Sequence, residues 1–165
     1  MKISLIIPCH KRTELLRYSL LCALDQDYPD YEIILVEDGT DNKELFNEFS
    51  IENSRLRYFS QPYKGYARLA RISNIGAEQA QGELLIFIDG DVLIEPSFIS
   101  KHVDYHKKHK TSVIIGRGVQ LARNAVSVNN ASINFEKIKQ NLLLDAKKDE
   151  VLRAGMFEQE EYIAS

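Results

Sequence analysis

The run Leu84-Leu85-Ile86-Phe87-Ile88-Asp89-Gly90-Asp91-Val92 places five apolar residues directly before two carboxylates that one glycine separates. A short apolar run predicts a buried strand, central in a parallel sheet, and it is too short to cross a bilayer. We expect the strand to end at the acids, because burying unpaired carboxylates is costly. Ligands bind at the carboxyl ends of strands in such sheets, so Asp89 and Asp91 are expected at the mouth of a site. The alternative is a surface turn, since Asp-Gly is a common turn pair.

The bulk composition is that of one globular domain. The chain has 165 residues, of which 44% are hydrophobic and 27% charged. Its net charge of −3 does not indicate a nucleic-acid-binding protein. Two cysteines, Cys9 and Cys22, lack metal-ligand spacing and favour a reducing compartment. With no signal peptide at the N-terminus and no apolar run of transmembrane length, we expect a cytoplasmic protein.

Strands alternate with helical patterns along the chain, which predicts βαβ units and a mainly parallel sheet. Pro8 is expected to stop the first strand, Asp41 with Glu44 to cap the second helix, and Gly82 to cap the third. The expected strands are 2–7, 31–36, 56–60, 84–88 and 113–115, and the expected helices are 13–27, 41–49, 67–81, 95–110 and 134–153, with a polar connection at 124–130.

Polar clusters follow three of these strands, and neighbouring parallel strands end at the same edge of a sheet, so the clusters are expected to converge. Two carboxylates on one short turn are hard oxygen ligands suited to Mg²⁺ or Mn²⁺, which proteins commonly share with nucleotide phosphates. Lys11, Arg12, Arg68 and Arg71 would neutralise the remaining phosphate charge. The combination indicates a nucleoside diphosphate compound. The clusters are Pro8-Cys9-His10-Lys11-Arg12, Glu37-Asp38-Gly39-Thr40 and Asp89-Gly90-Asp91.

Other nucleotide-binding loops are missing. Neither Gly-x-x-x-x-Gly-Lys-Ser/Thr nor Gly-x-Gly-x-x-Gly follows the first strand, which counts against a P-loop NTPase and a dinucleotide-dependent dehydrogenase. The basic run Lys107-Lys108-His109-Lys110 matches the dipole at the end of a helix. Peripheral contact with an anionic membrane at the inner face is the alternative for this run.

The sequence also resembles a known family. Four motifs occur in order: Ile6-Ile7-Pro8-Cys9-His10-Lys11-Arg12, Ile34-Leu35-Val36-Glu37-Asp38-Gly39-Thr40, Asn74-Ile75-Gly76-Ala77 with Ala80-x-Gly82-Glu83, and Phe87-Ile88-Asp89-Gly90-Asp91. They resemble the nucleotide-binding half of the inverting family-2 glycosyltransferases with the GT-A fold. The resemblance implies a three-layer α/β/α fold with a Rossmann-like nucleotide-binding core at 1–120. Residues 121–165 would then be a connection and a helix that begin a truncated or reduced acceptor half.

The resemblance also implies ligands and residue roles. The donor would be a nucleotide-diphosphate sugar, most often a UDP-sugar, the cofactor Mn²⁺ or Mg²⁺, and the acceptor a glycan or lipid-linked molecule. Asp38 matches the acid that contacts the base, and Glu37 stands where Asp is more usual. The residues expected to bind the nucleotide are Pro8, Cys9, His10, Arg12, Glu37, Asp38, Arg68, Arg71, Asp89 and Gly90, and those expected to bind the metal are Asp91 and Asp89.

Two assignments stay open within this resemblance. The family's arginine precedes its asparagine directly, whereas Arg71 lies two places earlier, so Arg68 is a rival contact. An inverting transfer also needs a carboxylate as general base. Glu160 and Glu161 are the late candidates for it, and a solvated helix end or tail is the other interpretation of these acids.

Two other functions remain as alternatives. A nucleotidyltransferase would also use paired acids and a metal, but it predicts a glycine-rich loop with Arg or Lys after the first strand. A non-catalytic nucleotide-sugar-binding or interaction domain is favoured by the absence of a clear general base.

Overall fold

The computed structural model describes residues 1–109, 113–116 and 160–162. These residues fall into two units divided after residue 100, and each unit is described by itself. The elements in chain order are β1 (Ile3–Cys9), α1 (Thr13–Leu24), β2 (Tyr31–Asp38), α2 (Lys43–Ser50), β3 (Leu56–Gln61), α3 (Leu69–Gln79), β4 (Leu84–Phe87), α4 (Phe98–Lys108), β5 (Val113–Ile115) and β6 (Glu160–Tyr162).

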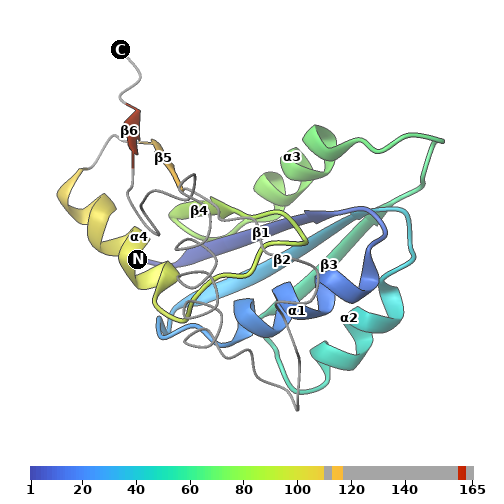
Figure 1. Cartoon of the computed structure of the whole chain (residues 1–165), viewed down its shortest axis with the longest axis horizontal. Coiled ribbons are helices and arrows are strands. Elements are labelled where there is room, and N and C mark those ends of the chain that lie inside the picture. Colours follow the sequence, from blue (N-terminus) through green and yellow to red (C-terminus); the bar gives the residue numbers. More distant parts are fainter. Residues whose placement is uncertain (110–112, 117–159, 163–165) are drawn as a thin grey trace, which may run out of the picture. The chain divides into compact units, whose positions relative to one another are not determined.

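The first unit is built on a four-stranded sheet with the order β3-β2-β1-β4. Each neighbouring pair of strands is parallel. Figure 1 shows α1 and α2 on one face of this sheet and α3 on the other. This arrangement confirms the predicted α/β fold with three layers and a parallel central sheet.

The two inner strands carry the core. Every residue of β1 and β2 is buried. On the α3 face, Ile72 packs with Ile6, Ile34 and Val36. The helix approaches the sheet closely at Gly76, where an added Cβ would lie 2.4 Å from a side-chain carbon of Ile6. The two fully buried strands therefore form the centre of the four-stranded sheet.

The prediction that β4 is a buried central strand is wrong for the sheet that the described residues form, because β4 lies at its edge. Leu85 is 37% exposed and Phe87 is 50% exposed, whereas Ile86 and Ile88 are buried. A short apolar run reports residue type but not the number of neighbouring strands. Only alternate residues of β4 therefore enter the core.

The prediction that Pro8 stops the first strand is also wrong, because β1 continues to Cys9. The carbonyl of Ile6 accepts a hydrogen bond from the amide of Ile88 at 3.1 Å, on the side that faces β4. Pro8 lies two residues later and faces the same side, beyond the last β1–β4 pair. Its missing N–H therefore removes no bond from the sheet.

Two predicted helix caps are wrong. The N-cap of α2 is Asn42 rather than Asp41, and it makes no side-chain capping bond. The C-cap of α3 is Ala80 in an extended conformation. Gly82 instead lies against β1, where an added Cβ would be 2.5 Å from the backbone nitrogen of Ser4. The glycine serves this close approach and not a helix end.

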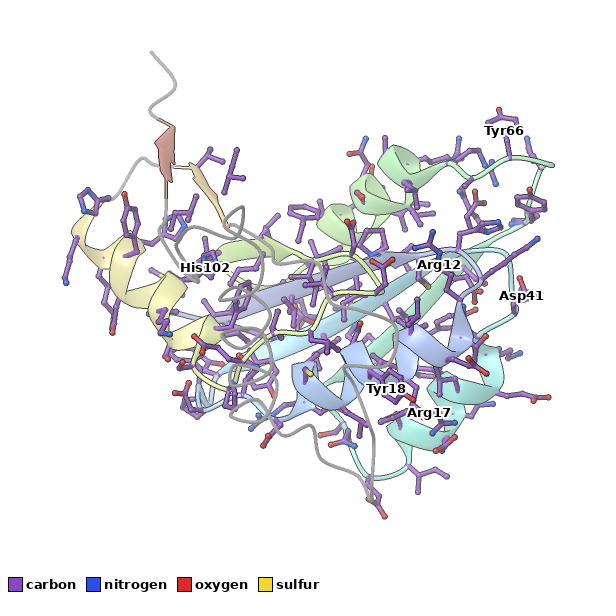
Figure 2. All side chains as sticks on the ribbon, in the orientation of Figure 1. Arg12, Arg17, Tyr18, Asp41, Tyr66 and His102 are labelled. Carbon is purple, nitrogen blue, oxygen red and sulfur yellow. The ribbon has the colours of Figure 1, made fainter. Side chains whose placement is uncertain are left out.

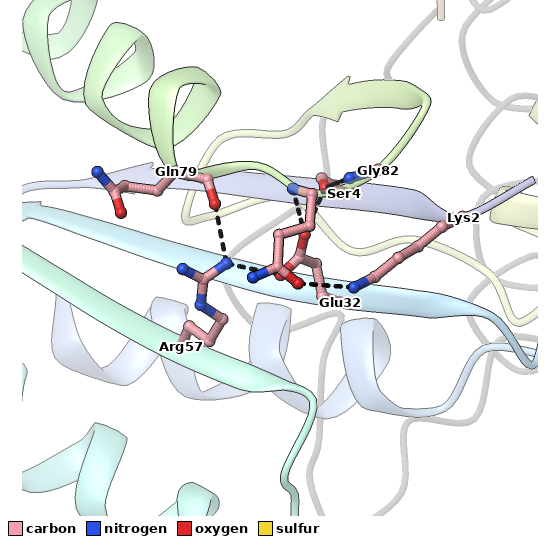
Figure 3. Close-up of polar contacts among 7 residues, drawn as sticks. Lys2, Ser4, Glu32, Arg57, Gln79 and Gly82 are labelled. Carbon is pink, nitrogen blue, oxygen red and sulfur yellow. Dashed lines mark hydrogen bonds and ion pairs between the residues drawn. The ribbon is translucent and has the colours of Figure 1, made fainter.

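A buried carboxylate fastens the connection between α3 and β4 (Figure 3). Glu32 accepts hydrogen bonds from Ser4 Oγ at 2.8 Å, Arg57 Nη1 at 2.8 Å and the amide of Gln81 at 2.7 Å. Burial alone would raise the pKa of Glu32, but the bonds from Arg57 and Ser4 outweigh it and lower that pKa. Because Ser4 and Glu32 pair near the starts of their strands, this network stabilises the sheet away from the polar strand ends.

The second unit contains β5 and β6, which pair antiparallel. The sequence shows no pattern at β6, because a three-residue strand depends on its partner. The predicted connection at 124–130 and the predicted helix at 134–153 lie outside the described residues. None of the described helices has the length and apolar character that spanning a membrane requires.

Candidate functional site

The polar strand ends meet at one edge of the sheet, as the sequence predicts. Cys9 pairs with Glu37, and Asp38 pairs with Gln61 one row further along. The last β1–β4 pair precedes the acidic turn by two residues, so Asp89 follows at the same edge. Figure 2 shows Arg12 and Asp41 at this end of the sheet.

The first loop joins the other two clusters directly. Its His10 Nδ1 lies 2.6 Å from the carbonyl oxygen of Asp38, so Nδ1 carries a proton and donates it. Arg12 forms an ion pair with Asp91 through Nη1 and Oδ2. Lys11 and Arg12 both adopt left-handed backbone conformations, with φ of 56° and 58°. The segment between β1 and α1 therefore contacts both acidic clusters.

Asp38 is fully buried but not unpaired. Its carboxylate accepts hydrogen bonds from Arg68 Nη2 and from the Arg68 amide, each at 2.7 Å, and from Gln61 Nε2 at 3.1 Å. The bonds from Arg68 lower the pKa of this carboxyl. This pairing is why β2 continues through both acids, whereas the sequence predicts its end at Val36. Of the two arginines that the sequence offers, Arg68 is the one that bonds to Asp38.

Glu37 is buried as well, and it contacts α2 and β3. Its oxygens accept hydrogen bonds from Asn42 Nδ2 at 2.7 Å and from the Tyr58 hydroxyl at 2.6 Å. Burial and this bond to Glu37 raise the pKa of Tyr58. Burial, and then the charge of Glu37, raise the pKa of the neighbouring Cys9 thiol. The structure places Glu37 and Cys9 beneath the site and not on its surface.

The acidic turn is held from its middle. The carbonyl of Gly90 accepts a hydrogen bond from Ser19 Oγ of α1 at 3.1 Å. An added Cβ at Gly90 would lie 3.2 Å from Cys9 Cβ, so the turn packs tightly on the end of β1. Asp89 and Asp91 on either side are exposed. The turn therefore holds Asp89 exposed to solvent and Asp91 paired with Arg12, both on a fixed backbone.

The carboxylates of the acidic turn could supply some, but not all, of the ligands of a metal ion. Among the described residues, no group of three or more His, Cys, Asp or Glu side chains could enclose a metal ion. Asp89 and Asp91 would supply hard oxygen ligands, and a bound diphosphate and water would complete the coordination. This pattern is typical of Mg²⁺-type sites that form with a nucleotide.

An aromatic side chain at the site was missed at the sequence level. Tyr63, after the end of β3, stacks on His10 with ring centroids 4.7 Å apart, and Lys11 Nζ lies 5.4 Å from the Tyr63 ring centre. Tyr63 as a whole remains 43% exposed. The sequence carries a signal for it, because Gln61-Pro62-Tyr63 directly follows the third expected strand at 56–60, at the same edge as the other polar strand ends.

The remaining predicted residues lie apart from these contacts. Pro8 is buried inside β1. Arg71 is exposed on α3, and its side chain makes no hydrogen bond or ion pair with the described part of the chain. Glu160 and Glu161 belong to β6 in the second unit, where they pair with Ile115 and Ile114.

The comparison with known proteins agrees with this geometry. The profile described as "Glycosyl transferase family 2" matches residues 4–158. The chain belongs to glycosyl transferase family 2. This membership confirms the resemblance that the four motifs indicate.

Curated relatives within the family extend beyond the matched region. The chain is 32% identical over 116 residues to the glycosyltransferase GlyG of Streptococcus pneumoniae, a match that covers 69% of this chain and 38% of GlyG. It is also 32% identical over 105 residues to an uncharacterised glycosyltransferase of Haemophilus influenzae, covering 62% and 41% of the two chains. The chain therefore matches about two fifths of each relative's length.

Solved structures share the GT-A fold. The match to residues 1–349 of S. aureus TarS in complex with UDP-GlcNAc has a TM-score of 0.60 and 24% identity, and it covers 73% of this chain and 37% of that fragment. The match to the mannosyltransferase PcManGT from Pyrobaculum calidifontis, in complex with GDP-Man and Mn²⁺, has a TM-score of 0.62 and 17% identity, and it covers 72% and 36%.

Proposed function

We propose that this family-2 chain binds a nucleotide-diphosphate sugar at the carboxyl edge of its sheet. We propose that it takes part in transferring the sugar to an acceptor with inversion at the anomeric carbon. The observation that carries the proposal is the contact between strand-end clusters from β1, β2 and β4. His10 bonds to Asp38, and Arg12 pairs with Asp91, although these residues lie far apart in sequence. Basic, acidic and aromatic groups are thereby gathered where a nucleoside diphosphate would lie.

For the base, we propose a position at the stacked rings of His10 and Tyr63, with the Asp38–Arg68 pair at its edge. Stacking supplies contact area to any base, and the charged pair supplies directional hydrogen bonds. We propose UDP as the nucleotide. The TarS complex supports a UDP-sugar, while the GDP-Man complex of PcManGT makes guanine the competing base.

For the diphosphate, we propose that Asp91, with Asp89, holds Mn²⁺ or Mg²⁺. Such a metal stabilises negative charge on the leaving diphosphate when it is bound. Arg12 lies beside this carboxylate, with its side chain 67% exposed and paired to Asp91. The guanidinium is therefore placed to contact phosphate oxygens from the protein side. The Mn²⁺ in the PcManGT complex supports a divalent metal in this fold.

For the chemistry, we propose a single in-line displacement. The acceptor hydroxyl attacks the anomeric carbon, the bond to the diphosphate breaks, and the hydroxyl proton passes to a carboxylate acting as general base. Glu160 and Glu161 remain the candidates for this base. We propose residues 1–120 as the nucleotide-sugar-binding part and residues 121–165 as the start of the acceptor part.

A lipid-linked or glycan acceptor is also a proposal. It is supported by a relative in Campylobacter jejuni named GalNAc(5)-diNAcBac-PP-undecaprenol beta-1,3-glucosyltransferase, which is 33% identical over 93 residues, 54% of this chain and 29% of the relative. A non-catalytic sugar-nucleotide-binding role is the second candidate, because no general base is identified among the described residues at the carboxyl edge of the sheet.

Calorimetric titration of UDP and GDP, with and without Mn²⁺, tests the proposal. We expect metal-dependent binding of a nucleoside diphosphate, and its loss in Asp91→Ala. Asp41→Ala is the matched control, because this exposed acid lies at the same end of the sheet (Figure 2). Absence of metal-dependent binding to either nucleotide would refute the proposal. Tight binding without hydrolysis or transfer of UDP-sugars would favour the non-catalytic role.

A further inference from the structure

We propose that Asn42, held by Glu37, is a positioning residue that fixes the backbone of the first loop and thereby aims Arg12 at the nucleotide site. The inference rests on the proposed function for its consequence in binding. It does not depend on that function for the contacts themselves, which are present in the unliganded chain.

The first loop needs an external restraint. Lys11 and Arg12 are consecutive non-glycine residues with φ of 56° and 58°. This left-handed conformation is unfavourable for residues with side chains and persists only where the surroundings impose it. The Arg12 side chain is mostly exposed, so its ion pair with Asp91 is a weak restraint on the backbone. A buried contact to the loop backbone must contribute more.

Asn42 makes that contact. Its Nδ2 donates to the carbonyl oxygen of Lys11 at 3.2 Å and to Glu37 Oε1 at 2.7 Å. Glu37 also accepts hydrogen bonds from the backbone amide of Asn42 at 3.1 Å and from the Tyr58 hydroxyl at 2.6 Å. Because Asn42 and Glu37 are both 0% exposed, water does not compete for these bonds. The strained backbone is thus tied to β2, α2 and β3.

One atom of Asn42 has no hydrogen-bond partner in the described part of the chain, which indicates that the orientation of this side chain is set by its contact with the loop. Among the described residues, Asn42 Oδ1 is the buried side-chain polar atom without a hydrogen-bond partner. Rotating the amide would not repair this, because it would turn the oxygen toward two acceptors, the Lys11 carbonyl and the Glu37 carboxylate. Asn42 therefore keeps the orientation that holds the loop, although one of its own atoms remains unsatisfied.

The same contacts explain why position 37 carries Glu. Shortening the side chain to Asp would withdraw the carboxylate by about 1.5 Å, the length of one C–C bond. The bonds to Asn42 Nδ2 and Tyr58 would then stretch beyond hydrogen-bond distance. The side chain of Glu37 therefore has the length that its carboxylate needs to reach both Asn42 and Tyr58.

Trypsin tests the restraint without any ligand, because it cleaves after arginine and Arg12 lies within the loop. We expect Asn42→Ala to speed cleavage of the Arg12–Thr13 bond about tenfold, which corresponds to loss of about 1.4 kcal/mol of local restraint. Cleavage after Lys64, in an exposed loop, should not change. The matched control is Asn53→Ala, which removes an Asn Nδ2 bond of 2.9 Å to the Phe49 carbonyl near the other end of α2.

Rescue separates positioning from general destabilisation. Glycine adopts positive φ without strain, so adding Lys11→Gly to Asn42→Ala should return cleavage after Arg12 to within about threefold of the parent. Tyr58→Phe removes one hydrogen bond to Glu37. It should leave the fold intact and speed cleavage after Arg12 less than Asn42→Ala does. Unchanged cleavage after Arg12 in Asn42→Ala, equal acceleration after Lys64, or failure of Lys11→Gly to rescue would each overturn the proposal.

Affinity for UDP with Mn²⁺ provides the second readout. We expect Asn42→Ala to weaken it about tenfold and Asn53→Ala to leave it unchanged. Parent-like affinity in Asn42→Ala would overturn the link to binding. If the parent chain binds neither UDP nor GDP, the proposed function fails, and the proteolysis result still decides whether Asn42 restrains the loop.

Discussion

Replacing Arg68 with methionine should destabilise the fold by leaving the Asp38 carboxylate without its main partner. Asp38 is 0% exposed and the Arg68 side chain is 12% exposed, so solvent hardly screens this pair. Methionine keeps the apolar stem of the side chain and removes the guanidinium donors. The bond of 2.7 Å to Asp38 Oδ1 and the longer bond from Nε are lost.

The expected magnitude follows from what remains around the carboxylate. Removing one partner of a buried ion pair costs about 3–5 kcal/mol. Asp38 would still accept hydrogen bonds from the amide of residue 68 and from Gln61, so we expect a smaller loss, about 2–4 kcal/mol, in the free energy of unfolding. Urea-induced unfolding at neutral pH, followed by circular dichroism, measures this loss.

The pH dependence provides an independent check. In the folded chain the pKa of Asp38 lies below its ordinary value because Arg68 donates to the charged form. The folded state therefore binds fewer protons than the unfolded state near that pH, and the pair's contribution is full above about pH 4 and lost as the pH falls further. The difference between the parent and Arg68→Met should shrink in this acidic range.

The control is Arg71→Met, on the next turn of α3 and exposed to solvent. It should change the free energy of unfolding by less than about 0.5 kcal/mol. The reasoning would be refuted if Arg68→Met were equally mild, if both variants lost the same stability, or if the difference for Arg68→Met stayed constant below pH 4.

The other predictions concern close contacts and buried thiols. Gly90→Ala brings a methyl group to 3.2 Å from a side-chain carbon of β1, so we expect a loss of about 1–3 kcal/mol in urea unfolding. Gly116→Ala, whose new Cβ would have no atom of the described residues within 4 Å, should be nearly neutral. Gly82→Ala meets β1 backbone at 2.5 Å, which cannot rotate away, so its loss should exceed that of Gly90→Ala, and equal losses would contradict the packing described. Burial raises the pKa of the Cys22 thiol to about 12 and raises that of Cys9 as well, so neither should react with iodoacetamide near pH 8 until urea unfolds the chain. Rapid labelling of the folded chain would show that the thiols are accessible.

The position of the site was predictable because it depends on local patterns. Apolar runs predict strands, and acids directly after such runs must lie near strand ends. Asp38, Asp89 and Asp91 are therefore predictable at one edge of the sheet, and the contacts of His10 and Arg12 confirm that the clusters meet there. Tyr63 follows the end of β3 and is predictable at this edge on the same ground.

The pairing of the charges was not predictable in this way. The sequence offers Arg68 and Arg71 as equivalent cations, but α3 begins so that the amide and the guanidinium of Arg68 both reach Asp38. Glu37 shows the same limit, because its contacts with Asn42 and Tyr58 depend on how α2 and β3 return to β2. These geometries arise only when the elements pack.

The sequence alone determined the alternation of strands and helices, the parallel sheet and the strand end at which each acid lies, since these follow from residue type and spacing. The tertiary structure decided that β4 lies at the edge of the described sheet, that Pro8 continues β1, and that Asp38 and Glu37 are buried in hydrogen-bonded networks. The physical reason is that the cost of desolvating a carboxylate is offset only where hydrogen-bonding partners surround it, and these partners lie on other elements.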